Sequence, residues 1–309
     1  MKASRAGIGE RLGKDIRRNK GAYLLFVPVL IWYILFQYLP LTNIIVAFQD
    51  YNIYRGISGS AWVGLENFAK FFKLRTFPVL VRNTVVLSLY GILFDFPAPI
   101  LLALMLNEVR HARIKSVMQT ISYMPHFISL VVVCGIIRDF CASDGVINQV
   151  LKLFGAKETY NLLSNPKLYR TIHISSSVWQ NCGWTSIIYL ASLSTIDPTL
   201  YEAAYIDGAS RLQRIIHVTL PGLVPIITVQ FIMRLGNIMS VGHEKIILLY
   251  NNLTYETADV ISTYLYRYGL LNGKYSMGTA IGLFNSVINI IILVSVNTMF
   301  RKFSEESLW

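Results

Sequence analysis

The stretch DPTLYEAAYIDGASRLQRIIHVTLP, residues 197–221, decides how the rest of the chain is interpreted. It begins with Asp197, a residue type that caps helix N-termini, and Pro198 suits the first helical position. Thr199 and Glu202 offer an alternative capping box slightly further on. With either cap, the stretch predicts that a helix begins here.

The same stretch predicts where this helix stops and a second one starts. Asp207-Gly208 ends the first helix, because glycine tolerates the left-handed conformation that closes many helices. Ser210 can cap a second short helix that reaches Thr219, and Pro221 then opens an apolar run. We expect a helix–turn–helix unit.

On both sides of this unit the chain consists of long apolar runs. Mean hydropathy is +0.48, and only 15% of the 309 residues are charged, whereas soluble domains have about a quarter. An apolar helix of about 20 residues, at about 1.5 Å per residue, crosses roughly 30 Å of hydrocarbon. We therefore expect an all-α membrane protein with six transmembrane spans, at about residues 22–48, 83–107, 116–137, 171–196, 220–241 and 275–300.

Six spans place both chain ends on one side of the membrane. Lys and Arg are denser in the segments on that side than in the opposite loops, and positive charge favours the cytoplasmic side. We expect a basic cytoplasmic segment (1–21), a transmembrane domain (22–300) with the cytoplasmic loop 197–219, and a cytoplasmic tail (301–309). The predicted location is a bacterial plasma membrane.

Several other chemistries are excluded. The net charge of +11 does not indicate nucleic-acid binding, because long uncharged runs do not fit a soluble basic domain. The three cysteines form no C-x-x-C pattern, so neither a disulfide framework nor a zinc site is predicted. The sequence also lacks the Walker A, H-E-x-x-H and G-x-S-x-G motifs. We expect no catalytic residue, metal site or cofactor in this chain.

Two charges stand inside expected spans, Asp95 in the second and Arg234 in the fifth. An ionisable residue in a span is costly and by default indicates a function. The two could pair, although the sequence does not set their relative depth. We expect His126 to pack between helices rather than bind a ligand, and His173 to lie at the outer membrane interface.

The loop resembles the EAA signature of ABC importer permeases, in which glycine follows the second alanine by four residues, as it does here. The resemblance implies a coupling loop that docks into a separate ATPase subunit. The small alanine side chains would let the backbone of the ATPase subunit approach closely, and the carboxylates would be available to bind that subunit. An ordinary surface connection is the alternative. The implied coupling residues are Glu202, Ala203, Ala204, Asp207, Gly208, Leu220 and Pro221.

A wider resemblance is carried by YMPHFIS (123–129), EKIILLY (244–250) and TYETAD (254–259). These stretches look like the LplB-type permeases of the carbohydrate-uptake group, which import complex oligosaccharides. The resemblance implies three kinds of partner: a second homologous permease, two ATPase subunits that bind ATP and magnesium, and an extracellular sugar-binding protein. The chain itself would then be a transport subunit and not an enzyme.

A sugar has apolar C–H faces and a hydroxyl rim, so aromatic and amide side chains are expected to hold it. Amides within spans should face a cavity or a partner rather than lipid. Alternatively, the tryptophans pack or face lipid and the amides bind helices together. We expect at least two of the amides to line a cavity at the interface with the second permease. The predicted substrate-path residues are Trp179, Gln180, Asn181, Trp184, Asn237, Asn285 and Asn289.

Two other functions are alternatives to oligosaccharide import. A secondary transporter or channel for a small polar solute predicts inverted repeats or paired broken helices, which the sequence does not show. A membrane enzyme would need clustered His, Asp or Glu, whereas the five histidines are dispersed. Neither explains the loop 197–219.

Overall fold

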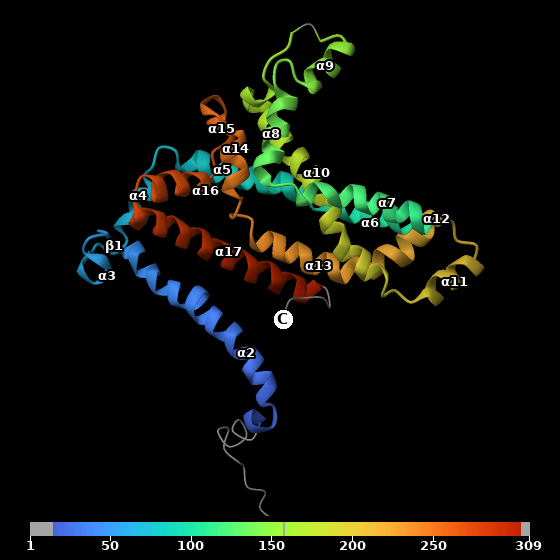
Figure 1. Ribbon diagram of the computed structural model, residues 1–309, viewed down its shortest axis with the longest axis horizontal. Helices are drawn as coiled ribbons and strands as arrows, with labels where there is room; N and C mark the ends of the chain where they lie inside the picture. Colours follow the sequence, from blue (N-terminus) through green and yellow to red (C-terminus); the bar gives the residue numbers. More distant parts are fainter. Residues whose placement is uncertain (1–14, 157, 304–309) are drawn as a thin grey trace, which may run out of the picture.

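The computed structural model describes residues 15–156 and 158–303, and this part of the chain is almost wholly helical. Long helices run along the longest axis of the molecule. At one end lies α11 (Pro198–Ile206), and at the other lies α3 (Gly56–Gly59) (Figure 1). The predicted all-α architecture is confirmed.

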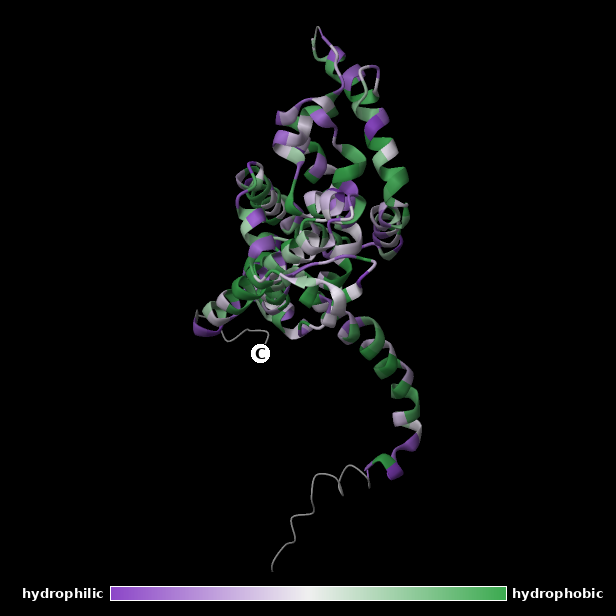
Figure 2. Cartoon of the chain, turned by 90° about the vertical axis from the view of Figure 1, so that its left-hand side faces the viewer, coloured by the Kyte–Doolittle hydropathy of each residue, from purple (hydrophilic) through white to green (hydrophobic). Residues whose placement is uncertain are grey.

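The first apolar run forms a helical rod that leaves the body of the molecule (Figure 1). None of the residues of its first part is buried, and its surface is largely apolar (Figure 2). The rod consists of α2 (Lys20–Tyr33), the π-helix η1 (Ile34–Tyr38) and the 3-10 helix η2 (Leu39–Phe48). It is followed by an antiparallel pair of short strands, β1 (Gln49–Asp50) and β2 (Ala61–Trp62), and by α4 (Glu66–Phe72).

A second rod runs without interruption from Phe77 to Asn107. It contains a π-helical turn in its middle, a feature that is rare and often found at functional sites. Its parts are α5 (Phe77–Tyr90), the π-helix η3 (Gly91–Asp95) and α6 (Pro97–Asn107). This rod packs along α10 (Pro166–Leu193).

The third expected span is broken rather than straight, so the single helix predicted over 116–137 is wrong. The helices on the two sides of the break are bent by 98°. The bend arises because Ser129 leaves the helical conformation and its side chain accepts the N–H of Val132, which caps a new helix. The segments are α7 (Ala112–Tyr123), the 3-10 helix η4 (Met124–Phe127), α8 (Leu130–Cys141) and α9 (Val146–Leu153).

The central helix α10 has 28 residues and buries Ser, Gln and His side chains as well as apolar ones. Four described helices are long and apolar enough to cross a membrane, and the bent pair would make a fifth. Because of its polar face, α10 is not apolar enough to be counted among these helices. The number of six spans therefore stays a prediction.

The second helix of the predicted helix–turn–helix is not separate from the fifth span. One rod runs from Arg211 to Gly236, so the expected end at residue 241 lies beyond it. The rod continues past residue 219 because a π-turn keeps the backbone helical up to Pro221, which sits in the first turn of the next helix. Its parts are α12 (Arg211–Arg214), the π-helix η6 (Ile215–Thr219) and α13 (Leu220–Gly236).

The polar segment between the last two rods, residues 241–275, folds into short helices. An ion pair of 2.7 Å between Asp259 and Arg267 holds it together. The short helices are α14 (His243–Leu249), η7 (Asn252–Thr254), α15 (Tyr255–Ala258), α16 (Ile261–Tyr264) and the π-helix η8 (Leu265–Leu271). The short η5 (Leu162–Ser164) lies beside η7, and α17 (Tyr275–Phe303) ends the described chain.

Asn83 fastens this segment to the rods, and its removal should destabilise the protein. Its fully buried amide donates to the carbonyl oxygens of Glu256 (3.0 Å) and Asp259 (2.9 Å) and accepts from Arg170 (2.8 Å). Asn83→Ala removes all three hydrogen bonds, at about 1–3 kcal/mol for each buried group that is left unsatisfied, although the Glu256 carbonyl still accepts from Arg82 (3.0 Å). We expect a lower unfolding temperature in detergent. The exposed Gln149→Ala is the matched control, and equal melting of the two variants would contradict this role.

Candidate functional site

The loop at the end of the molecule begins with the predicted cap. The Asp197 carboxylate accepts the N–H of Thr199 at 2.9 Å, and Pro198 takes the first helical position. The same hydrogen bond holds the pKa of Asp197 below its usual value. Of the two predicted caps, the Asp197 cap is therefore the one that forms.

Gly208 closes α11 with the geometry that the sequence predicts. Its φ is +75°, in the left-handed region. The N–H of Ala209 donates to the Ala204 carbonyl (2.9 Å), and that of Gly208 to the Tyr205 carbonyl (3.1 Å), which is a Schellman ending. A capping box between Ser210 and Gln213 then starts α12. A Cβ at Gly208 would meet nothing within 4 Å in this chain, so space around it is open to a partner.

The predicted coupling residues lie on an exposed surface at this end. Glu202, Ala203, Asp207 and Pro221 are exposed, Ala204 is half-buried, and Leu220 is 38% exposed. Two apolar side chains that the sequence reasoning did not select are the most prominent: Tyr205 is 71% and Ile206 83% exposed. The signal for them was present, since both stand within the EAA-like stretch.

Two polar cavities lie between the second rod, α10 and the α13 rod. The first has a volume of about 270 Å³ and extends toward Gly242; the second has about 400 Å³ and extends toward Tyr189. Both are lined by Asp95, Asn181, Arg234 and Asn237. Side chains from three separate segments of sequence therefore converge at one place.

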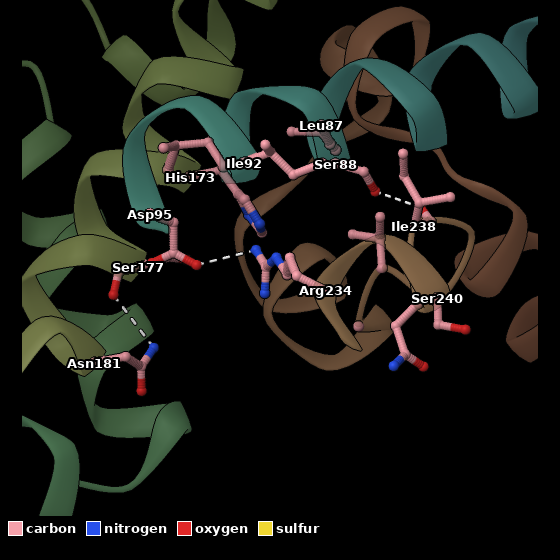
Figure 3. A pocket seen from close by; sticks show the side chains of 14 residues that line it. Leu87, Ser88, Ile92, Asp95, His173, Ser177, Asn181, Arg234, Ile238 and Ser240 are labelled. Carbon is pink, nitrogen blue, oxygen red and sulfur yellow. Dashed lines mark hydrogen bonds and ion pairs between the residues drawn. The ribbon is translucent and has the colours of Figure 1, made fainter. Parts of the chain in front are cut away.

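The two charges inside expected spans do pair. Arg234 donates to Asp95 at 3.0 Å, and the two side chains point at each other from α13 and η3 (Figure 3). Gly91 makes this possible, because a Cβ there would lie 2.6 Å from the guanidinium. The pair is partly open to the cavities, with the Arg234 side chain 45% exposed.

Two of the five predicted amides, Asn181 and Asn237, line both cavities. Asn181 donates to the Ser177 carbonyl (3.2 Å) and lies 3.1 Å from the His126 ring nitrogen Nδ1. Asn237 donates to the Met233 carbonyl (3.0 Å).

The other three predicted amides lie elsewhere. Asn289 donates to the Ser240 hydroxyl (2.7 Å) and accepts the Met239 N–H (3.1 Å), which binds α17 to the end of α13. Asn285 faces a separate cavity beside Ser240. Gln180 is buried in α10 outside the two polar cavities.

The two predicted tryptophans do not line the polar cavities. Trp184 is 45% exposed and stacks on His126, with ring centroids 4.8 Å apart. Trp179 is also about half exposed and lies at an apolar hollow beside α8. His126 packs against Trp184 as expected, and His173 is buried within the protein, so its expected place at the membrane interface stays a prediction.

Lys245 adds a cation that the sequence reasoning did not assign to the site. Its ammonium donates to the Ser177 hydroxyl (2.7 Å) and to the His173 carbonyl (3.2 Å). Burial lowers the pKa of Lys245 to about 8, so it is still predominantly protonated at neutral pH. The first cavity therefore has positive charge behind one wall.

Within the described residues, no three His, Cys, Asp or Glu side chains form a group that could hold a metal.

Comparisons with known proteins agree on one kind of molecule. The family model "Binding-protein-dependent transport system inner membrane component" matches residues 95–305. The polygalacturonan/rhamnogalacturonan transport system permease protein YteP of Bacillus subtilis is 40% identical, over 97% of this chain and 94% of its own. Protein LplB of the same organism is 41% identical over 98% and 96%. A bacterial alginate ABC transporter, solved with a periplasmic protein that holds an alginate pentasaccharide, has a chain with 43% identity and a TM-score of 0.87 over 96% of this chain and 100% of its own.

If the two polar cavities form the substrate path, the amides lining them should matter for transport. Asn181→Ala and Asn237→Ala each remove a hydrogen-bonding group that a sugar hydroxyl can use, which amounts to about 1 kcal/mol or several-fold in rate. We expect reduced substrate uptake by the assembled transporter with normal assembly and basal ATP hydrolysis. Asn272→Ala, in the exposed turn before α17, is the control. Unchanged uptake in both cavity variants would assign these amides a packing role.

Proposed function

The chain belongs to the family of binding-protein-dependent transport system inner membrane components, and we propose that the importer it serves takes up acidic oligosaccharides. It is a permease subunit of an ABC importer for oligosaccharides and not an enzyme. The single observation that carries the proposed substrate class is an arginine in the wall shared by both polar cavities.

The acidic character of the substrate has support from outside this chain as well. Its relatives include a transporter named for polygalacturonan, a polymer of a sugar acid, and an importer of alginate, an acidic polysaccharide. A carboxylate sugar entering a low-dielectric passage needs a cation, and guanidinium matches carboxylate geometry. Arg234 offers that group, and Lys245 adds positive charge nearby.

The importer needs partners for energy and for substrate delivery. Family membership implies two ATPase subunits and a second permease, and the related alginate transporter was solved with a periplasmic sugar-binding protein. We assign ATP and magnesium to the ATPase subunits. The exposed α11, with Tyr205 and Ile206 at its tip, suits docking into a cleft of that partner.

The second permease should cover the apolar surface that this chain leaves open. The helix α2 has no buried residue and diverges from the body (Figure 1), so it can contact lipid or the partner along its whole length. The two cavities would then become part of a closed passage between the two subunits.

The chain is a membrane protein, and we propose that both its termini are cytoplasmic. The α17 rod starts beside η2 and α4 and runs back toward the end where α11 lies (Figure 1). Since α11 is assigned to the ATPase and ATP is cytoplasmic, this end faces the cytoplasm. The basic N-terminal residues agree with that assignment.

The substrate class can be tested with the complete importer in proteoliposomes. We expect uptake of a trigalacturonate or a short alginate oligomer when the binding protein and ATP are supplied, and little uptake of a neutral trisaccharide of the same length. Uptake of the neutral sugar alone would contradict the acidic class while leaving the permease assignment intact.

Gly208 tests the coupling role of the α11 loop. Gly208→Val forces a β-branched residue to φ +75°, at about 1–2 kcal/mol of strain, whereas Gly208→Asn tolerates this conformation better. We expect Gly208→Val to lower uptake and sugar-stimulated ATP hydrolysis by about tenfold while the protein still reaches the membrane. An equal loss in Gly208→Asn would indicate that the partner needs the open space. Normal coupling in Gly208→Val would refute docking at this turn.

A further inference from the structure

The Asp95–Arg234 ion pair stands where the two polar cavities meet. Along α10, the first cavity is lined from His173 to Asn181, and the second from Asn181 to Tyr189. Along the α13 rod, the second cavity extends from Asn237 back toward the coupling loop, as far as Gln230. The first cavity thus opens toward the polar segment 241–275, and the second toward the coupling loop. The ion pair, together with Asn181 and Asn237, is the wall that the two cavities share.

The residues around Arg234 form a specific site for its guanidinium, which distinguishes Arg234 from an ordinary surface charge. The π-turn η3 carries both Asp95 and Gly91, so the same turn supplies the partner carboxylate and the space for the guanidinium. The contact with Asp95 uses one of the five N–H groups of arginine. With 45% of its side chain exposed, Arg234 can present other N–H groups to the cavities.

We propose that Arg234 is a subsite for the carboxylate of an acidic sugar, which it receives in exchange for Asp95. This inference rests on the acidic substrate class proposed above. In the empty state Asp95 neutralises Arg234 and the pair closes the junction between the cavities. A sugar carboxylate can replace Asp95 because it offers the same charge and the same paired oxygens.

The exchange makes the junction selective. An acidic sugar gives Arg234 a new anion in place of Asp95, so of the two charges in the pair only the Asp95 carboxylate loses its partner. A neutral sugar can break the pair only by leaving both charges without a partner, which is less favourable. The junction therefore discriminates against neutral sugars through the cost of unpaired charges, in addition to its attraction for acidic ones.

The competing explanation is a structural staple, that is, an ion pair that only holds the two helices together. Replacing each partner of the pair in turn distinguishes this structural role from a carboxylate subsite. Asp95→Asn removes the carboxylate but keeps the guanidinium available to the sugar. Arg234→Gln removes the guanidinium. A staple predicts similar losses, because both variants break the same bond. A carboxylate subsite predicts that only Arg234→Gln loses transport.

The experiment uses the complete importer in proteoliposomes and measures uptake of trigalacturonate together with the amount of assembled complex. We expect Asp95→Asn to keep uptake within about threefold of the wild type and Arg234→Gln to lose about tenfold or more. Arg234→Lys should lie between them, since it keeps the charge but not the paired geometry. Arg75→Gln, an exposed position outside the cavities, is the charge-matched control.

The double variant Asp95→Asn/Arg234→Gln keeps the test decisive if Arg234→Gln alone fails to assemble. It leaves no uncompensated charge, so a staple predicts recovered uptake, whereas the subsite predicts continued loss in an assembled complex. Equal losses in the two single variants, or recovery in the double variant, would overturn the inference. Absence of trigalacturonate uptake by the wild type would instead refute the proposed substrate class, which is a separate result.

Discussion

Hydrocarbon offers no hydrogen bonds, so a polar side chain on a membrane helix must be satisfied by protein or by a water-filled space. The arrangement of this molecule follows from that constraint on α10. Its buried polar side chains, among them Ser176, Gln180 and His173, are covered by the second rod, the α13 rod and the segment 241–275. Where the side chains of these neighbours do not fill the space, two polar cavities remain, and the Asp95–Arg234 pair stands between them.

The rod that carries Arg234 begins with α12, the second helix of the proposed coupling loop. From Arg211 to Arg234 it extends about 35 Å at the rise of an α-helix. Its first turns are tied back to α11 by the hydrogen bond between the Tyr201 and Thr219 hydroxyls (3.1 Å). A displacement of α11 by an ATPase subunit can therefore reach the ion pair through one continuous helix. This gives a physical route from nucleotide-driven motion to the junction between the cavities.

Local chemistry made part of this structure predictable from the sequence. The Asp197 cap, the glycine ending at 208 and the Ser210 start depend on residues a few positions apart, and all three are present. The bend at Ser129 and the π-turns were missed, since hydropathy does not report backbone breaks. The Asp95–Arg234 pair could not be predicted because it joins residues far apart in sequence, whose depths are set by packing. Of the expected amides, Asn181 and Asn237 face the polar cavities, whereas Asn289 binds helices together.

If the cavities that Asn237 lines belong to a polar passage between this chain and the second permease, residue 237 must be accessible from water in the assembled importer. In a variant with Cys134, Cys141 and Cys182 replaced by Ala, Asn237→Cys would be exposed to a water-soluble, membrane-impermeant thiol reagent in the assembled importer. The reagent should label this position from the aqueous phase, and bound acidic oligosaccharide should slow the labelling. If the reagent never reaches the position, or labels it at the same rate with and without the sugar, Asn237 does not line the substrate passage.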